Sequence, residues 1–407
     1  MKDSAPNTLV LYSHYTDKLS YYDDWKHAFE THPDFSTSSI NINDRSNLAL
    51  AKNSIRDFDL IVLLHSTNAD TLQQIRPYTD VLNSRTGVLL SFVGNEVNLP
   101  RISLKEKIDF LKDISAEYIG TQLPVEAGRW LYEECASSRV VELPHALNPE
   151  SFRPEIPLDN RPIDIGARST RYWSCLGDNE RNDLFDFFSH HSFIPPIVVD
   201  IDTKNRLDRT GWAGFLNNCK GTISNEAGSY YLERDDATIR RIQEYVITNQ
   251  KQDGSHIVRP DSLPEKLWNL MPQPVKALLR YPLNAVLNSF RVKYYSDVYE
   301  DLEFPEIFER FFRNTPRCPA YSKAISSRHF DAIGTKTCQI MLKGRYNGIL
   351  NADEHYIALE HDFSNIESVM QRFHDKSYRH SLVERTYEYI MDQHTYYHRI
   401  TAVRELV

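Results

Sequence analysis

The sequence predicts an α/β fold built from two doubly wound domains, and three observations predict it. Short apolar runs typical of buried parallel strands alternate with helical stretches over the first 150 residues. A proline-rich segment then interrupts this alternation, and a second strand–helix series follows. The chain has 407 residues, 41% of them hydrophobic, which suffices for two cores because a domain takes roughly 100–200 residues. Repeated βα units favour open sheets that bind ligands at the carboxyl ends of their strands.

The first series occupies residues 1–150 and predicts an N-terminal Rossmann-like domain. Its strongest strands, Asp59–His65 and Gly87–Phe92, are continuous apolar runs that suit a sheet covered on both faces. The other expected strands are Thr8–Tyr12, Ser39–Ile42, Glu117–Ile119 and Arg139–Leu143, and the expected helices are Tyr21–Phe29, Ala69–Leu82, Leu104–Leu111 and Val125–Glu134.

The second series occupies residues 151–380 and begins after a hinge that contains Pro144, Pro149, Pro154 and Pro157. Residues 250–318 break its rhythm and are interpreted as an insertion. The expected strands are Ile163–Ala167, Ile197–Ile201, Thr222–Ser224 and Thr337–Leu342, and the expected helices are Asn179–Phe188, Trp212–Asn218 and one from about Ser326 to Ala332.

The end of the chain is predicted to be helical. Ser364 and Ser381 are each followed three residues later by Glu, the pattern of a capping box, so both are expected to open helices. We expect residues 381–407 to form a C-terminal helical segment that packs back toward the N-terminal domain.

Composition excludes several classes of protein. A net charge of −9 argues against bulk nucleic-acid binding, which usually requires a basic face. The five cysteines are far apart without a CxxC motif, so we expect no disulfide framework or zinc site. The N-terminus lacks the pattern of a signal peptide, and no apolar run approaches the ~20 residues of a membrane helix. A cytoplasmic protein is expected.

Residues 264–295 alternate basic with apolar side chains. Such a segment could contact an anionic membrane surface, which would place the protein peripherally at the inner face of the membrane. The alternative is a set of short helices that pack on the domain and leave their Lys and Arg side chains solvated, because prolines divide the segment.

The most informative chemistry follows Ser326. A helix that begins there would present unpaired N–H groups at Ser327, and these can hold a diphosphate. Arg328 would add a bidentate partner for phosphate oxygens. Asp331, one turn into the helix, could accept hydrogen bonds from ribose hydroxyls. The same residue types are also common at ordinary helix starts.

The region from Ser326 to Ile366 resembles the C-terminal half of GT-B glycosyltransferases, in the branch of CgeB-like proteins and the "glycosyl transferases group 1" domain. The resemblance extends over roughly residues 85–370. The residues that carry it are Arg328, Phe330, Asp331, Ala332, Thr337, Tyr346, Ile349, Leu350, His355, Tyr356, Leu359, Asp362, Phe363, Ser364, Asn365 and Ile366. It implies a GT-B fold, with the acceptor bound by the N-terminal domain and the donor by the C-terminal domain.

The resemblance implies a glycosyltransferase that uses a nucleoside diphosphate sugar, with no metal and no further cofactor, and a glycan, glycolipid or protein as acceptor. Two positions depart from the family pattern. Asp331 stands where Glu is usual, and Lys323 stands where the upstream Glu of the E-x(7)-E pattern would fall. Asp200-Ile201-Asp202 imitates a D-x-D metal motif that belongs to a different glycosyltransferase fold, so we expect no metal there.

Further site residues are expected from position in such a fold. Arg168 and Arg171 follow the first strand of the second domain and could neutralise the leaving diphosphate, whereas Arg181 is a poorer candidate. Small residues between Glu226 and Ser229 permit close approach of a ligand. The candidate bases in the first domain are His65 and Glu96, each of which could equally be structural.

Three functions remain open from the sequence. The leading hypothesis is the glycosyltransferase. The second is a sugar-nucleotide epimerase, which would need several acids and histidines around one sugar ring. The third is a non-catalytic GT-B module that binds sugar nucleotides or serves as a scaffold at a membrane surface. The missing upstream Glu favours the third reading, and the pair of Arg328 and Asp331 argues against it.

Overall fold

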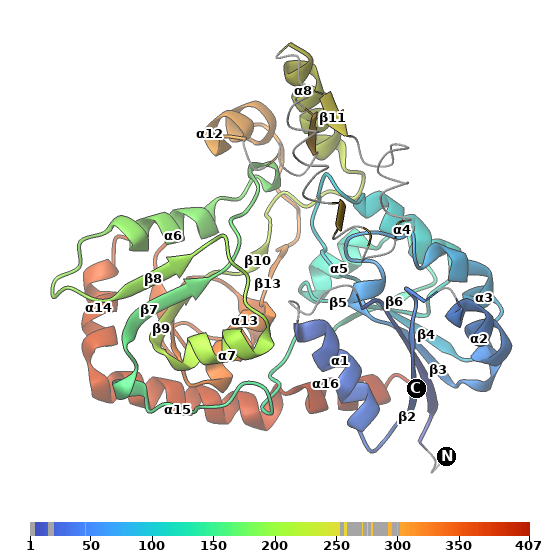
Figure 1. The fold of residues 1–407 in the computed structure, drawn as a ribbon, viewed down its shortest axis with the longest axis horizontal. Helices are drawn as coiled ribbons and strands as arrows, with labels where there is room; N and C mark the ends of the chain where they lie inside the picture. The colour runs from blue at the N-terminus through green and yellow to red at the C-terminus, as the bar shows by residue number, and fades with distance from the viewer. Residues whose placement is uncertain are drawn as a thin grey trace.

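The chain forms two domains, each with a parallel sheet flanked by helices (Figure 1). The computed structural model describes residues 5–14, 20–44, 46–252 and 302–407, together with isolated positions between 253 and 301. The fold class predicted from the sequence is confirmed.

The N-terminal sheet has six parallel strands in the order β2-β1-β3-β4-β5-β6. Its central strands are apolar and buried, as their continuous hydrophobic sequences predict. The strands are β1 (Asn7–Tyr12), β2 (Ser36–Asn41), β3 (Leu60–Leu63), β4 (Val88–Phe92), β5 (Tyr118–Thr121) and β6 (Arg139–Glu142).

Among the described residues of the first 150, the helices beside this sheet are α1 (Ser20–Thr31), α2 (Asn47–Ser54), α3 (Thr79–Asn83), α4 (Leu104–Asp113) and α5 (Val125–Leu131). The prediction of one helix over Ala69–Leu82 is wrong, because regular α-helix begins only at Thr79, after a 3-10 turn over Arg76–Tyr78. Pro77 lies in that turn. Proline has no N–H to donate, so it is tolerated in the first turn of a helix but not in its interior. Helix α2 was not predicted.

The C-terminal sheet has five parallel strands in the order β15-β14-β9-β7-β8. They are β7 (Ile163–Arg168), β8 (Val199–Asp202), β9 (Cys219–Ser224), β14 (Cys338–Leu342) and β15 (Ile357–Leu359). The helices are α6 (Glu180–His190), α7 (Arg209–Asn217), α13 (Ser327–Gly334) and α14 (Ile366–His374). A short antiparallel pair, β10 (Ala227–Gly228) and β13 (Lys323–Ala324), joins the strand β9 region to the start of α13.

The insertion follows β10 and is described only in part. Its elements are α8 (Ala237–Gln252), the parallel pair β11 (His256–Val258) and β12 (Val292–Tyr294), and α12 (Phe304–Ile307), which continues as a π-helix over Phe308–Phe312. The basic segment 264–295, for which contact with a membrane surface and packing on the domain were both open, lies outside the described residues apart from isolated positions. Within the described part of the chain, no helix is both long enough and apolar enough to cross a bilayer.

The chain ends in two helices that return to the first domain. Helix α15 (Lys376–Gln393) runs beneath the C-terminal domain, and α16 (Tyr396–Arg404) lies against α1 of the N-terminal domain (Figure 1). Tyr396 and Ile400 share a buried cluster with Trp25. The C-terminus therefore completes the core of the N-terminal domain.

The capping predictions have different outcomes. The prediction at Ser381 is wrong, because this residue lies inside α15, whose true cap is Asp375; its carboxylate accepts the N–H of Tyr378 at 3.0 Å. A helix does open near Ser364, but it begins at Ile366 after Asn365. Local residue spacing alone does not distinguish an N-cap from an exposed Ser in mid-helix.

Candidate functional site

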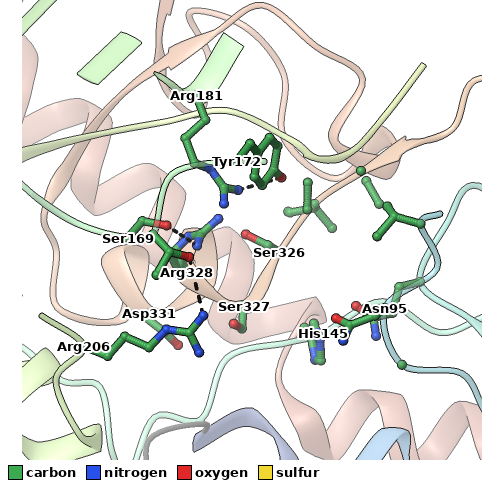
Figure 2. A pocket seen from close by; sticks show the side chains of 18 of the residues that line it. Asn95, His145, Ser169, Tyr172, Arg181, Arg206, Ser326, Ser327, Arg328 and Asp331 are labelled. Atoms are coloured by element: carbon green, nitrogen blue, oxygen red, sulfur yellow. Dashed lines mark hydrogen bonds between the residues drawn. The ribbon is translucent and has the colours of Figure 1, made fainter. Parts of the chain in front are cut away.

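A cavity of about 470 Å³ lies between the two domains. Its walls are loops that follow the carboxyl ends of strands in both sheets, where open α/β sheets bind ligands. Figure 2 shows arginines of the C-terminal domain on one side and Asn95 and His145 of the N-terminal domain on the other. The cavity thus has a cationic wall in the second domain and an opposing wall in the first.

The N-terminus of α13 faces this cavity. Ser326, Ser327 and Arg328 all line it. Ser326 has extended backbone angles, and its N–H donates to Nδ1 of His329 at 3.0 Å, which fixes the start of the helix. Burial lowers the pKa of His329 to about 3, so this capping imidazole is neutral. The N–H of His329 donates to the Ser326 carbonyl at 3.2 Å, and the partial positive charge of the helix start, at Ser327, attracts an anion in the cavity.

Two residues predicted to bind the donor substrate, Arg328 and Asp331, extend this wall. The Nη1 of Arg328 donates to the Ser169 hydroxyl at 2.8 Å, which aims the guanidinium along the cavity. Asp331 is 5% exposed, and one carboxylate oxygen accepts the indole N–H of Trp212 at 2.9 Å. Burial raises the pKa of Asp331 well above its ordinary value. Ser327, Arg328 and Asp331 therefore line the same cavity, and their contact with a donor stays a prediction.

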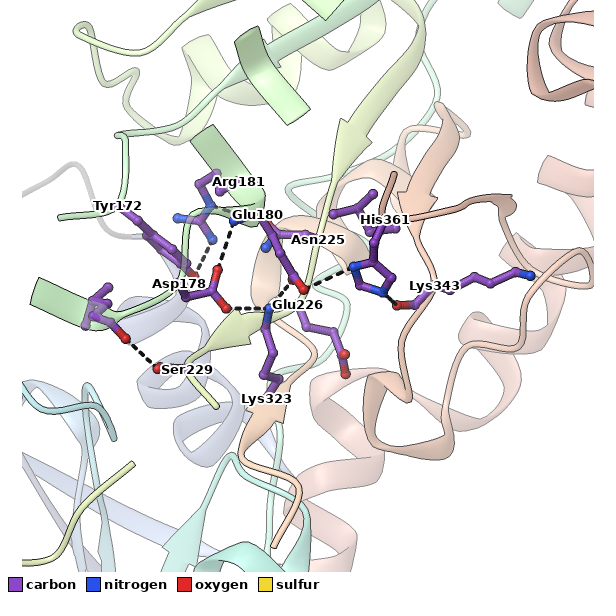
Figure 3. Close-up of polar contacts among 12 residues, drawn as sticks. Tyr172, Asp178, Glu180, Arg181, Asn225, Glu226, Ser229, Lys323, Lys343 and His361 are labelled. Atoms are coloured by element: carbon purple, nitrogen blue, oxygen red, sulfur yellow. Dashed lines mark hydrogen bonds and ion pairs between the residues drawn. The ribbon is translucent and has the colours of Figure 1, made fainter. Parts of the chain in front are cut away.

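Arg181, which sequence reasoning ranked low, lines the same wall and is 5% exposed. Its guanidinium lies 3.8 Å over the ring of Tyr172, donates to the Tyr172 hydroxyl at 2.8 Å, and reaches Asn225 Oδ1 at 3.4 Å (Figure 3). Within the described ranges, no carboxylate forms an ion pair with Arg181; nearby Asp178 pairs with Lys323 instead. Burial lowers the pKa of Arg181, so its charge is held at a cost.

The two arginines predicted on the loop after β7 differ in position. Arg168 lines the cavity, but its Nη2 lies 2.7 Å from Asp200 and its guanidinium lies 3.9 Å over Phe215, so part of its charge is already neutralised. Arg171 does not line the cavity, because it forms an exposed ion pair with Asp186. The position of Arg171 does not support its predicted contact with donor phosphates.

Glu226 and Ser229 lie behind the cavity wall, although Ala227 and Gly228 between them line it. The Glu226 carboxylate is buried and accepts hydrogen bonds from the Tyr321 hydroxyl and, at 2.7 Å, from the Tyr346 N–H. The Ser229 hydroxyl donates to the carbonyl of Leu176 at 2.6 Å. Their side chains thus support the wall, and their positions do not support the predicted contact with the donor.

Lys323 stands where the E-x(7)-E pattern would place an acidic residue. Two carboxylates surround it, so a basic side chain suits this position. The side chain is fully buried, with Nζ 2.8 Å from Asp178 and also paired with Glu180 (Figure 3). Burial opposes the charge of Lys323, but the two carboxylates more than offset this and raise its pKa. Glu180 is further paired with Nδ1 of His361 at 3.1 Å. This network joins β13 to the start of α6, which carries Arg181.

His65 does not reach the cavity. It is completely buried, and its ring packs against Phe92, His145 and Trp25, with centroids 4.7, 5.3 and 5.6 Å away. Burial holds the pKa of His65 well below its ordinary value. The prediction that His65 contacts substrate is therefore not supported, and His145 lines the cavity in front of it.

Glu96 does line the cavity, but three donors surround its carboxylate. Oε1 accepts the hydroxyls of Thr121 at 2.7 Å and Tyr132 at 2.6 Å, and Oε2 accepts the N–H of Gln122 at 2.8 Å. Burial raises the pKa of Glu96, against the effect of these bonds. Such a carboxylate holds the loop after β5 in place.

No family model matches the chain, and neither does any curated protein. Solved structures resemble it at low identity over nearly the whole of each chain. Anabaena HepE in complex with UDP-glucose has 8% identity and a TM-score of 0.46, covering 98% of this chain and 99% of that one. Sucrose-phosphate synthase from Thermosynechococcus elongatus has 11% identity and a TM-score of 0.45, covering 98% of each. The N-terminal domain of Candida albicans trehalose-6-phosphate phosphatase has 10% identity and a TM-score of 0.42, covering 99% and 96%.

Structural similarity at these sequence identities and TM-scores establishes no function for this chain. The fold follows from its own topology: two Rossmann-like sheets face each other across a cavity, and a C-terminal helix returns to the first domain. That is the GT-B arrangement.

Proposed function

We propose that this protein is a glycosyltransferase that takes a nucleoside diphosphate sugar as donor and transfers the sugar to a hydroxyl of a glycan, glycolipid or protein. The observation that carries the proposal is Arg181, a buried guanidinium on the cavity wall whose described partners, Tyr172 and Asn225, are neutral. Asp178 favours the charge of Arg181 electrostatically but is itself paired with Lys323, so the buried guanidinium can still gain from an anion in the cavity.

A diphosphate fits the rest of that wall. Arg181 and Arg328 line it together with the first turn of α13, so two guanidinium groups and a helix N-terminus converge on the cavity. These groups would neutralise the charge that develops on a departing nucleoside diphosphate, the role for which other enzymes use a metal ion. We therefore propose metal-independent transfer.

The nucleoside would extend toward Asp331 and Trp212, which line the cavity beyond Arg328. Because Asp331 holds a proton more readily than an ordinary carboxyl, it can both donate to and accept from ribose hydroxyls. The acceptor would approach from the opposing wall of the N-terminal domain. Residues of both domains line the cavity, so closure over the substrates would exclude water.

A panel of UDP, GDP, CDP, ADP and TDP tests this proposal by thermal shift. One of them should raise the melting temperature, since a ligand at about 100 times its Kd stabilises by about 2.7 kcal/mol. Ser327→Asp should abolish the shift, because it places a carboxylate against the phosphates. The free variant should melt as the wild type does, since Asp suits the first turn of a helix. Ser364→Asp, an exposed substitution just before α14, is the matched control.

No shift with any nucleotide at millimolar concentration, or an undiminished shift in Ser327→Asp, would refute the donor site. Nucleotide binding without release of nucleoside diphosphate from the corresponding sugar nucleotides would favour the non-catalytic module over the transferase.

A further inference from the structure

The insertion that follows β10 belongs to the C-terminal domain but also reaches the N-terminal one. Its side chains Ile242 of α8 and Phe312 share a buried cluster with Cys175 of the C-terminal domain. Leu232, which precedes α8, instead joins the core cluster of the N-terminal domain and is 3% exposed. In Figure 1, α8 and α12 lie at the top of the view, whereas α15 and α16 lie at the bottom. The two domains are therefore joined on two sides of the molecule.

Hydrogen bonds make most of the contact between the insertion and the N-terminal domain. The Asn98 amide donates to the Glu233 carbonyl and accepts the Glu233 N–H, both at 2.8 Å, and it donates to Asp236 Oδ1 at 2.6 Å. The other oxygen of Asp236, Oδ2, accepts the Ser103 hydroxyl at 2.6 Å and the Lys105 N–H at 3.1 Å. We call Asn98, Ser103, Glu233 and Asp236 the clasp.

The central residue of the clasp is held in a costly conformation. Asp236 is 3% exposed and has a φ of 55°, in the left-handed region that costs energy for a residue other than glycine. Its bonds to Ser103 and Lys105 reach the first turn of α4, where a carboxylate is favourable. The insertion thus helps to cap a helix of the other domain, and this contact stabilises the strained backbone of Asp236.

Helix α4 connects the clasp to the cavity. Lys107 of this helix is 1% exposed. Its ammonium group donates to the carbonyls of Ala69 at 3.1 Å, Gly94 at 2.6 Å and Asn95 at 3.1 Å, and Gly94 and Asn95 line the cavity. Burial lowers the pKa of Lys107 to about 8, and nearby carboxylates, including that of Asp236, oppose this shift. The helix that the clasp caps therefore also holds the loop after β4 at the cavity.

The clasp lies next to both walls of the cavity. Asn98 directly follows Val97, which lines the wall formed by the N-terminal domain. On the other wall, Gly228 lines the cavity at the point where the insertion leaves β10. Single side chains, Asn347 and Arg209, also bridge the domains. Widening the cavity on the side of the insertion would therefore require the clasp to break.

The two attachments of the insertion differ in chemistry. The clasp consists of polar groups that can bond to water when they separate, so the net free-energy change for each bond is small. The cluster that includes Cys175, Ile242 and Phe312 is apolar and would lose its burial if it separated. The insertion should therefore move with the C-terminal domain, and the contact that breaks should be the clasp.

We propose that the insertion is a strap that holds the cavity closed and that Asn98 and Asp236 fasten it. With the clasp formed, the two walls keep the separation of this structure. With the clasp broken, the domains turn apart about the opposite side, where the linker at Leu147 lies beside Thr395. The strap would act whichever ligand the cavity takes. For the proposed transfer it would decide the rate, because reacting atoms must come within about 3–3.5 Å of each other.

Double electron–electron resonance between spin labels on the two domains measures their separation. Asp80→Cys in α3 and Ser368→Cys in α14 place the labels at exposed helix positions, on opposite sides of the molecule in Figure 1. All samples carry Cys318→Ser, because among the described cysteines only Cys318 is not buried. The wild-type sequence in this background gives the reference distance.

Two variants break the clasp in different ways. Asn98→Asp places a second carboxylate against Asp236 and removes the N–H groups that bond Glu233 and Asp236. Asp236→Gly removes the carboxylate but keeps the left-handed backbone, so it should fold even if Asn98→Asp does not. Both should lengthen the mean distance by more than about 2 Å, the scale of domain rearrangements. The change should be larger in Asn98→Asp, because Asp236→Gly keeps the bonds between Asn98 and Glu233.

Asn53→Asp is the matched control, because it makes the same chemical change at an exposed position of α2 and should leave the distance unchanged. Thermal unfolding identifies the variants that are folded. A distance within about 2 Å of the reference in either folded clasp variant, or an equal lengthening in Asn53→Asp, overturns the strap. These distances are measured without nucleotide, so the strap and the proposed function can fail separately.

Discussion

Replacing Arg181 by methionine should weaken binding of the nucleoside diphosphate much more than it changes the stability of the free protein. Methionine is an unbranched apolar side chain that can adapt to the space beside Tyr172. The substitution removes the buried charge proposed to pair with the donor diphosphate, and with it the bonds to Tyr172 and Asn225. The two effects should differ in size because, among the described residues, no carboxylate forms an ion pair with Arg181, and Asp178, which acts on it electrostatically, is paired with Lys323.

The expected loss of affinity follows from the contacts. A hydrogen bond to a charged group contributes about 1.5–3 kcal/mol, and each 1.4 kcal/mol is a factor of ten, so Kd for the nucleoside diphosphate should rise about 10- to 150-fold. In the free protein, the lost bonds to two neutral groups cost about 1 kcal/mol each. Removing a desolvated charge offsets this cost. The melting temperature of the free variant should therefore change by only a few degrees at most.

Isothermal titration calorimetry measures the affinity, and thermal unfolding of the free protein measures the stability. Arg171→Met is the matched control, because Arg171 lies on the same stretch of chain but forms an exposed ion pair away from the cavity. Its Kd should stay within about twofold of the wild type, since surface ion pairs contribute little. Equal affinities for wild type and Arg181→Met, or equal losses in both variants, would refute the reasoning.

Two further outcomes are expected. The bond to Glu180 raises the pKa of His361, so its contribution to stability is fully present below about pH 6.5 and is lost as the pH rises through the folded-state pKa. His361→Gln should therefore lower the urea midpoint more at about pH 5.5 than at about pH 9, and equal losses would contradict this. Separately, Asn225 Nδ2 and Gln339 Oε1 have no partner in the described part of the protein and are buried beside a cavity of about 20 Å³. A cavity of that size holds one water, so a crystal structure should show a water bonded to both, and a dry cavity would contradict the expectation.

Local signals explain which parts of the molecule were predictable from sequence. Strands β3 and β4 are short apolar runs, and burial on both faces of a parallel sheet leaves that pattern in the sequence itself. The helix start that carries Ser327, Arg328 and Asp331 could be predicted because a helix start and its first turn are contiguous in sequence. Their position at the cavity depends on β13, which leads into α13 and pairs with β10 outside the five-stranded sheet, a pairing that the sequence did not predict.

Other features of the site could not be predicted from the sequence, because they depend on contacts between segments that are distant along the chain. His65 follows a buried strand, as a strand-end base would, but Trp25 of α1 and Tyr396 of α16 complete the aromatic cluster around it. Arg181 has no distinctive local sequence, and its role depends on Tyr172 and Asn225, which come from two other loops. Lys107 reads as an ordinary helix lysine, and only the packing of α4 beneath two loops shows its three carbonyl partners.

Lys323 bears on whether the missing upstream acid indicates a degenerate, non-catalytic module. Lys323 lies on β13, which leads directly into α13, and its partners Asp178 and Glu180 lie at the start of α6. Breaking a buried pair of this kind costs about 3–5 kcal/mol, so the network holds the two helix starts rigidly together. One of those starts carries Arg181, and the other presents Arg328 and its N–H groups to the cavity. The lysine thus fixes the geometry of the proposed anion site, and its presence at this position does not argue against catalysis.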